Sequence, residues 1–374
     1  MQFEDIRPYS DAECPEVIQK LLRQPAFAGA VHTYFPEVPE EQLRALFLSC
    51  RTIRDFQQRI IAAVVAKIIA SSLTELSVAG LEGLDPARPY LYMSNHRDIV
   101  LDSAFLNYGL NKTGFPTSEI AIGSNLLEIG WVRDLVRINK SFIVKRGLPI
   151  QEMLEASKTL SAYIDYAIHV KGESVWIAQR EGRTKDGNDR TNPGLLKMFG
   201  LGTDKNLLEH LIDLNIVPVS ISYEYDPCDY LKIPELAARA KGESYTKKPG
   251  EDVQHMLSGI QGSKGRVQIT FSRPISEELA ALTEIRNRNE QLRAVAQIID
   301  RHIHQNYRLW PTNFIAADLL HGSSRFEAHY TAAEQHHFQQ YMKERLQTFA
   351  EQELAGKLFL ETYANPVFNQ ISDQ

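Results

Sequence analysis

The sequence has 374 residues, of which 43% are hydrophobic and 24% are charged, the composition of a folded soluble protein with a substantial core. Its formal net charge of −6 argues against a general nucleic-acid binder. The three cysteines (Cys14, Cys50 and Cys228) are far apart and odd in number, which argues against a disulfide framework or a zinc site and fits a reducing cytoplasm. Acidic residues and proline stand at the start, where a signal peptide needs a basic and then an apolar segment, so we expect no export signal.

Residues 1–80 are predicted to form an N-terminal helical region. Apolar residues recur there at three- and four-residue spacing, for example in residues 14–24, 39–50 and 51–76. The most apolar run, "IIAAVVAKIIA" from Ile60 to Ala70, carries Lys67 and is shorter than the roughly 20 residues that a membrane span needs. We interpret it as a core or interfacial helix.

Residues 81–275 alternate short apolar runs with helical stretches, which predicts an α/β core with a largely parallel sheet. Residues 276–374 are predicted to be a C-terminal helical region. The expected strands are "YLYMS" (90–94), "SFIVK" (141–145), "SVWIA" (174–178), "IVPVSIS" (216–222) and "RVQITFS" (266–272).

A histidine follows the first of these strands, in "NHRDIVLD". At a junction between a strand and a helix, His96 could take a proton from a hydroxyl if Asp98 or Asp102 fixed its orientation. Asn95 or Asp98 would also make a good helix N-cap, with His96 merely filling the turn. The residues alone leave both interpretations open.

Two later segments carry basic residues that could bind an anion. "RDLVRINKSFIVKRG" holds five basic residues against one acid and ends with Lys145 and Arg146, which suit a phosphate. The alternative is an ordinary solvated face.

The other segment, "REGRTKDG", also follows a strand directly. Gly182 would let the backbone approach a ligand, Arg183 and Lys185 could bind phosphate, and Glu181 could accept a hydroxyl. A charged loop with internal ion pairs is the alternative. In the next strand, Pro218 suggests a sheet edge or a bulge.

Taken in order, "NHRDIVLD", "SFIVKR", "REGRTKDG" and "VPVSISYE" resemble the four motif blocks of the glycerolipid O-acyltransferase family, which includes glycerol-3-phosphate and 1-acyl-sn-glycerol-3-phosphate acyltransferases. The blocks span roughly a third of the chain. The resemblance implies a mixed sheet flanked by helices, like that of glycerol-3-phosphate acyltransferase.

Two blocks depart from the family pattern. Five residues separate His96 from Asp102, where the family usually has four, and this rotates the Asp by about 100° on a helix. Asp102 therefore reaches His96 only if the intervening turn absorbs the extra residue, and Asp98 is the other possible partner. The Glu181-Gly182-Arg183 block also lacks the family's middle residue.

The resemblance implies transfer of a fatty acyl group from acyl-CoA or acyl carrier protein to a hydroxyl of glycerol phosphate or lysophosphatidate, in phospholipid biosynthesis. His96 would be the general base and Asp102 would orient it. Arg146, Arg183 and Lys185 would hold the acceptor phosphate, with Glu181 and Gly182 beside them and Lys145 and Pro218 as further members. No metal or cofactor is implied.

An enzyme of this kind is expected in the cytoplasm, peripheral on the inner face of a membrane. We expect contact through the basic residues 133–146 and an amphipathic helix at Ile60 to Leu73. Two alternatives use the same residues: a thioester or lipid hydrolase with the same His-Asp pair, and a phospholipid-binding protein without activity. The acceptor, the acyl donor, the chain length and the oligomeric state do not follow from the sequence.

Overall fold

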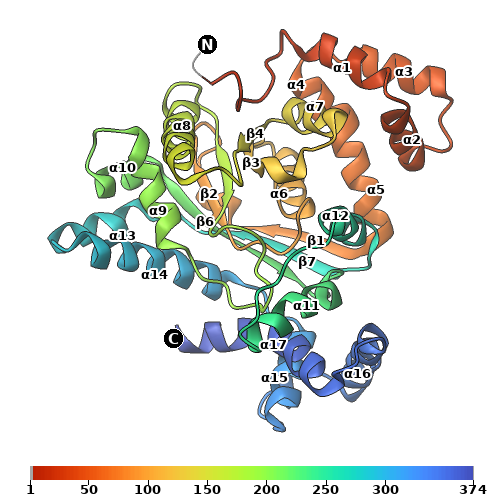
Figure 1. Cartoon of the computed structure of the whole chain (residues 1–374), viewed down its shortest axis with the longest axis vertical. Coiled ribbons are helices and arrows are strands. Elements are labelled where there is room, and N and C mark those ends of the chain that lie inside the picture. The colour runs from red at the N-terminus through yellow and green to blue at the C-terminus, as the bar shows by residue number, and fades with distance from the viewer. Residues whose placement is uncertain (1–2, 374) are drawn as a thin grey trace.

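A single seven-stranded sheet forms the centre of the protein, which we describe from a computed structural model for residues 3–373 (Figure 1). The strand order is β1-β7-β6-β2-β5-β3-β4. The strands are β1 (Leu73–Ala79), β2 (Leu91–Ser94), β3 (Glu119–Gly123), β4 (Ser141–Val144), β5 (Val175–Ala178), β6 (Ile216–Tyr223) and β7 (Gly265–Phe271).

The sheet is mixed, because β6 and β7 pair antiparallel while every other neighbouring pair is parallel. This confirms the predicted α/β class with a mixed sheet flanked by helices. Strands β2 to β6 all run in the same direction, so their carboxyl ends meet along one edge. Side chains that follow these strands are therefore brought together.

Helices cover both faces of the sheet. Because side chains alternate along a strand, Leu91 and Met93 enter one apolar cluster, while Tyr90 and Tyr92 enter another. The first face is covered by α8 (Ile150–His169), α9 (Pro193–Phe199), α10 (Leu207–Asp213), α13 (Ser276–Ala280) and α14 (Arg288–Asn306). The second is covered by α5 (Ala62–Ser72), α6 (Leu101–Lys112) and α12 (Glu251–Gln261).

A separate cluster of apolar side chains lies at the N-terminal end of the chain. It packs four short helices against α7 (Gly130–Ile138). The four are α1 (Cys14–Leu22), α2 (Pro25–Tyr34), α3 (Glu40–Leu48) and α4 (Ile53–Phe56), and a π-helix (Gln57–Ile61) leads from α4 into α5.

The C-terminal helices pack on α11 (Asp229–Ala240) and are anchored by one buried carboxylate. Asp229 accepts hydrogen bonds from the hydroxyls of Tyr341 and Tyr363, each at 2.8 Å, and from Nε of Arg345 at 2.9 Å. These helices are α15 (Pro311–His321), α16 (Ala332–Leu346) and α17 (Gln352–Ser372). A buried carboxylate with three donors therefore fixes α16 and α17 on α11.

Two strands were not predicted. β1 lies inside residues 1–80, which were expected to be helical, and the predicted helix over 51–76 gives way to this strand at Leu73. β3 was also missed, in a stretch where no strand was expected. Both pair in parallel, β1 with β7 and β3 with β4 and β5.

Pro218 corrects a further expectation, because it lies in β6, an inner strand between β7 and β2. It pairs with Met93 of β2, and its carbonyl accepts from the backbone N–H of Ser272, just beyond β7. The nitrogen of a strand residue points to the same side as its carbonyl, so the missing N–H faces the end of β7, where the regular ladder has stopped. An inner strand tolerates proline at such a point.

The apolar run from Ile60 to Ala70 forms the end of the π-helix and most of α5. Ile60, Val65 and Ile68 are buried, and Val65 and Ile68 pack in the cluster on the second face. Its apolar side chains therefore stabilise the core. Within residues 3–373, no helix combines the length and apolar character needed to cross a bilayer.

Candidate active site

His96 lies at the carboxyl edge of the sheet, directly after β2. Its Nδ1 is 2.7 Å from Oδ2 of Asp102, in the first turn of α6. The Asp102 side chain is fully buried, whereas that of His96 is 13% exposed. A carboxylate accepts hydrogen bonds, so Nδ1 carries the proton. Nε2 bonds to none of the described residues and keeps a lone pair that can act as a base.

The turn between the two residues absorbs the five-residue spacing. Oδ2 of Asp102 also accepts from the backbone N–H groups of Arg97, at 2.6 Å, and Asp98, at 3.1 Å. These bonds curl residues 97–100 around the carboxylate before the helix begins. Asp102 therefore reaches His96 despite the extra residue.

Asp98 is not the partner of His96 but caps α6. Its Oδ1 accepts from the backbone N–H groups of Val100, at 2.9 Å, and Leu101, at 2.8 Å. Burial and the nearby charge of Asp102 raise its pKa. The capping role that the sequence left open thus belongs to Asp98.

Tyr223, at the end of β6, completes the surroundings of Asp102. Its hydroxyl donates to Oδ1 of Asp102 at 3.0 Å, and burial raises its pKa well above the ordinary value, so it stays a donor. Sequence reasoning missed this role. The available signal was its position at the carboxyl end of a strand beside β2.

Arg146 and Glu181, which follow β4 and β5, form an ion pair on the same edge. Nη1 of Arg146 is 2.5 Å from Oε1 of Glu181, and their side chains are 34% and 70% exposed. Gly182 has a φ of 70°, and a Cβ there would meet nothing within 4 Å. The turn thus requires glycine for its backbone conformation.

Arg183 and Lys185, predicted to face a ligand, turn inward. Nη2 of Arg183 is 2.6 Å from Nδ1 of His255, and Nζ of Lys185 is 2.7 Å from Oε2 of Glu235. Burial lowers the pKa of Lys185. The backbone N–H of Thr184 donates to the carbonyl of His96 at 2.9 Å, which joins this loop to the histidine turn. Lys145 instead pairs with Asp5, near the N-terminus.

The ion pair of Arg97 and Asp189 stabilises the histidine turn. Nη2 of Arg97 is 2.6 Å from Oδ2 of Asp189, and Nδ2 of Asn95 donates to the same oxygen at 3.2 Å. Both partners of the Arg97–Asp189 pair are buried. Asn95 also bonds both backbone groups of Ile221 in β6. The turn is therefore fixed on both sides.

Helix α17 holds the loop that follows β5. The hydroxyl of Thr362 lies 3.2 Å from the carbonyl oxygen of Lys185 and 3.0 Å from that of Leu358, between which its proton is shared. Nδ2 of Asn365 donates to the carbonyl of Asp186 at 2.7 Å. A Cβ on Gly187 would overlap the carbonyl oxygen of Thr362. The C-terminal region thus fixes the path of the loop that carries Glu181 to Lys185.

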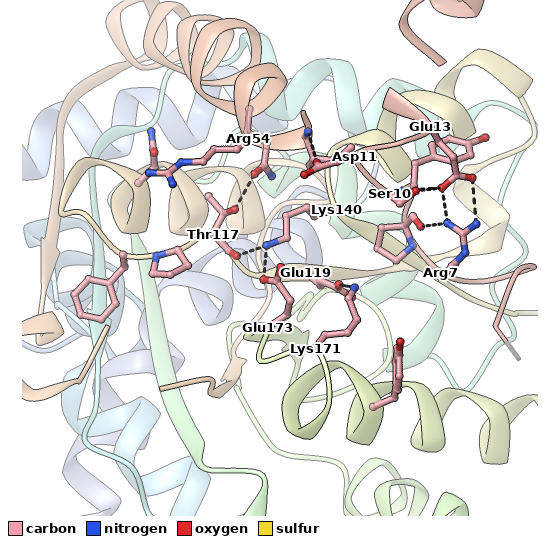
Figure 2. A pocket seen from close by; sticks show the side chains of 18 of the residues that line it. Arg7, Ser10, Asp11, Glu13, Arg54, Thr117, Glu119, Lys140, Lys171 and Glu173 are labelled. Atoms are coloured by element: carbon pink, nitrogen blue, oxygen red, sulfur yellow. Dashed lines mark hydrogen bonds and ion pairs between the residues drawn. The ribbon is translucent and has the colours of Figure 1, made fainter. Parts of the chain in front are cut away.

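A cavity of about 1580 Å³ lies at the opposite edge of the sheet (Figure 2). Its walls include residues that precede β3, β4 and β5. Nζ of Lys140 bonds the carbonyl of Thr117, at 2.7 Å, and Glu173, at 2.6 Å, while Lys171 pairs with Glu119. The charges of these two lysines are therefore neutralised by neighbouring carboxylates.

The strands and turns of the carboxyl edge lie in a segment of the chain that matches a known family. Residues 75–222 match the family model described as Acyltransferase. No curated protein matches the chain. Among solved structures, the 1-acyl-sn-glycerophosphate (LPA) acyltransferase PlsC from Thermotoga maritima matches at 12% identity and a TM-score of 0.38, over 77% of this chain and 94% of that chain.

Gly259 on α12 provides a test of the packing over the histidine turn. A Cβ there would overlap the carboxylate of Asp98, so we expect Gly259→Ala to lower the free energy of unfolding by about 1–3 kcal/mol. Gly29 in α2 has no neighbour within 4 Å of such a Cβ, and Gly29→Ala should be neutral or stabilise by up to about 1 kcal/mol. Urea denaturation measures both, and equal effects would contradict the packing.

Proposed function

Because residues 75–222 are an acyltransferase domain, we propose that the protein moves a fatty acyl group from an acyl thioester to a hydroxyl of glycerol phosphate or lysophosphatidate, in phospholipid biosynthesis. The donor is acyl-CoA or acyl-acyl carrier protein. The observation that carries the proposal is the bond between Nδ1 of His96 and buried Asp102, which leaves Nε2 as a base.

In the proposed reaction, Nε2 of His96 takes the proton of the acceptor hydroxyl. The oxygen attacks the thioester carbonyl carbon, the carbon–sulfur bond breaks, and the thiolate takes the proton back from the imidazolium. Asp102 stabilises the imidazolium between these steps and keeps the ring in place. Tyr223 and two backbone N–H groups hold Asp102 in turn.

We assign binding of the acceptor phosphate to the basic side chains at the carboxyl edge of the sheet. Arg146 is the accessible one, since its side chain is one-third exposed and, among residues 3–373, only Glu181 pairs with it. A phosphate can displace that carboxylate by offering two oxygens to the guanidinium. Arg183 is more deeply buried, with 6% exposure, and adds positive charge. Lys185 contributes less, because Glu235 already neutralises it.

We further propose that the protein works in the cytoplasm as a peripheral protein on the inner face of a membrane, which it contacts with this same edge. Exposed apolar side chains gather where α7 and α8 begin, after β3 and β4: Ile129, Ile150, Met153 and Leu154, of which Ile150 is 85% exposed. Exposed apolar groups at such a site suit an interface with lipid. The helix from Ile60 to Leu73 suits it less, because part of its apolar face is in the core.

Release of free thiol from a long-chain acyl thioester, with and without glycerol 3-phosphate or lysophosphatidate, tests the reaction. We expect release only with an acceptor, and a rate about 10²- to 10⁴-fold lower for His96→Ala, because the general base is lost. Release without acceptor would instead indicate a hydrolase. Lipid binding without any release would indicate a binding protein.

Substitution of the two aspartates separates their roles. Asp102→Asn should lower kcat by about 10³-fold or more, because the histidine loses its carboxylate partner. Asp98→Asn keeps an oxygen that can accept from Val100 and Leu101, so its kcat should fall less than about 10-fold. The same assay measures both, and an equally severe Asp98→Asn would contradict the assignment.

Sedimentation with anionic phospholipid vesicles tests the membrane contact. Ile150→Ser combined with Met153→Ser should weaken binding about 10-fold or more, since two large apolar groups are lost. Val170, at the other end of α8, is 70% exposed, and Val170→Ser is the matched control that should bind like wild type. Equal losses, or no binding by wild type, would contradict this surface.

A further inference from the structure

Helix α12 covers the histidine turn, although it lies outside residues 75–222. Gly259 packs directly on the carboxylate of Asp98. At the other end of the helix, Oδ2 of Asp252 is 3.5 Å from Nδ2 of Asn125, just after β3. His255, one turn before Gly259, lies on the same inner face and is 4% exposed. The inner face of α12 is therefore a wall of the site.

His255 accepts a hydrogen bond from Arg183. A guanidinium only donates, so Nδ1 of His255, 2.6 Å from Nη2, is the acceptor and its proton is on Nε2. Burial and the charge of Arg183 lower the pKa of His255 to about 4. The imidazole is thus neutral near pH 7, as this bond requires. The backbone carbonyl of His255 accepts from the thiol of Cys228 at 3.2 Å, which holds this turn of α12.

The other end of the guanidinium is unpaired. Arg183 is 6% exposed, and its Nη1 is buried without a hydrogen-bond partner among residues 3–373. A buried donor of a charged group costs free energy until it is satisfied. The next residue, Thr184, bonds the carbonyl of His96. The residue that carries the unpaired donor is therefore next to one that bonds the backbone of the proposed base.

We propose that His255 is a positioning residue for the acceptor: by accepting from Nη2, it fixes the guanidinium of Arg183 so that Nη1 remains for the acceptor phosphate. This inference rests on the proposed function, since it gives the phosphate to the same edge as His96. His255 itself touches no reacting atom. Its loss should weaken binding of the acceptor and leave the chemical step nearly intact.

Steady-state kinetics at pH 7 with glycerol 3-phosphate and a long-chain acyl-CoA tests this role. His255→Ala should raise the acceptor KM about 10-fold, the loss expected when a charge-assisted contact is released, with kcat within about 3-fold of wild type. The KM for the thioester should not change. His255→Asn should recover most of the acceptor KM, because its amide oxygen can accept near the position of Nδ1.

His210 provides the matched control. It is a second buried histidine, 1% exposed, on α10, and burial lowers its pKa as well. His210→Ala removes a buried neutral imidazole without touching the carboxyl edge, so its acceptor KM should match wild type. An unchanged acceptor KM in His255→Ala, or the same rise in His210→Ala, would overturn the inference.

Calorimetry with inorganic phosphate separates this inference from the proposed function. If wild type transfers no acyl group, the proposed reaction fails, yet a phosphate Kd about 10-fold weaker in His255→Ala, and restored in His255→Asn, still supports the role of His255. A Kd that is equal in wild type and His255→Ala contradicts that role, whether or not transfer occurs.

Discussion

The buried carboxylate of Asp102 is the interaction on which the rest of the site depends. Four donors converge on it: Nδ1 of His96, two backbone N–H groups of the following turn, and the hydroxyl of Tyr223. A buried carboxylate costs free energy when its oxygens lose their donors, so these groups are held together. One side chain thereby sets the orientation of the histidine, the path of the turn, the start of α6 and the link to β6.

The fold class and five of the seven strands could be predicted, because their apolar runs are bounded by turns or helices. β1 escaped prediction because Leu73 continues directly from α5, with no glycine or proline between them, and several of its side chains are exposed, as befits an edge strand. In β3, "EIAIG" is short, and its buried Glu119 is paired with Lys171, which lies far along the chain between α8 and β5. Local patterns carry no signal for such tertiary pairing.

The site was predictable where neighbouring residues make it, and hidden where distant ones do. The sequence offered Asp98 and Asp102 as partners of His96, and the turn between them brings Asp102 into contact. The sequence also predicted Arg183 as a phosphate ligand, but not its inward direction, because His255 lies 72 positions away. Basic residues in a loop indicate that the loop could bind an anion. Tertiary contacts decide which of these side chains face solvent.

The contacts of α17 with the loop after β5 have a consequence for biosynthesis. On the ribosome, the whole sheet and its histidine turn are translated before Thr362 and Asn365, which hold the backbone of Lys185 and Asp186. A nascent chain can thus form the pair of His96 and Asp102 while the loop after β5, which carries Arg183 and Lys185, is not yet held by α17. The proposed binding of the acceptor phosphate would then become possible late in folding, after α17 has docked, and not when the core first forms.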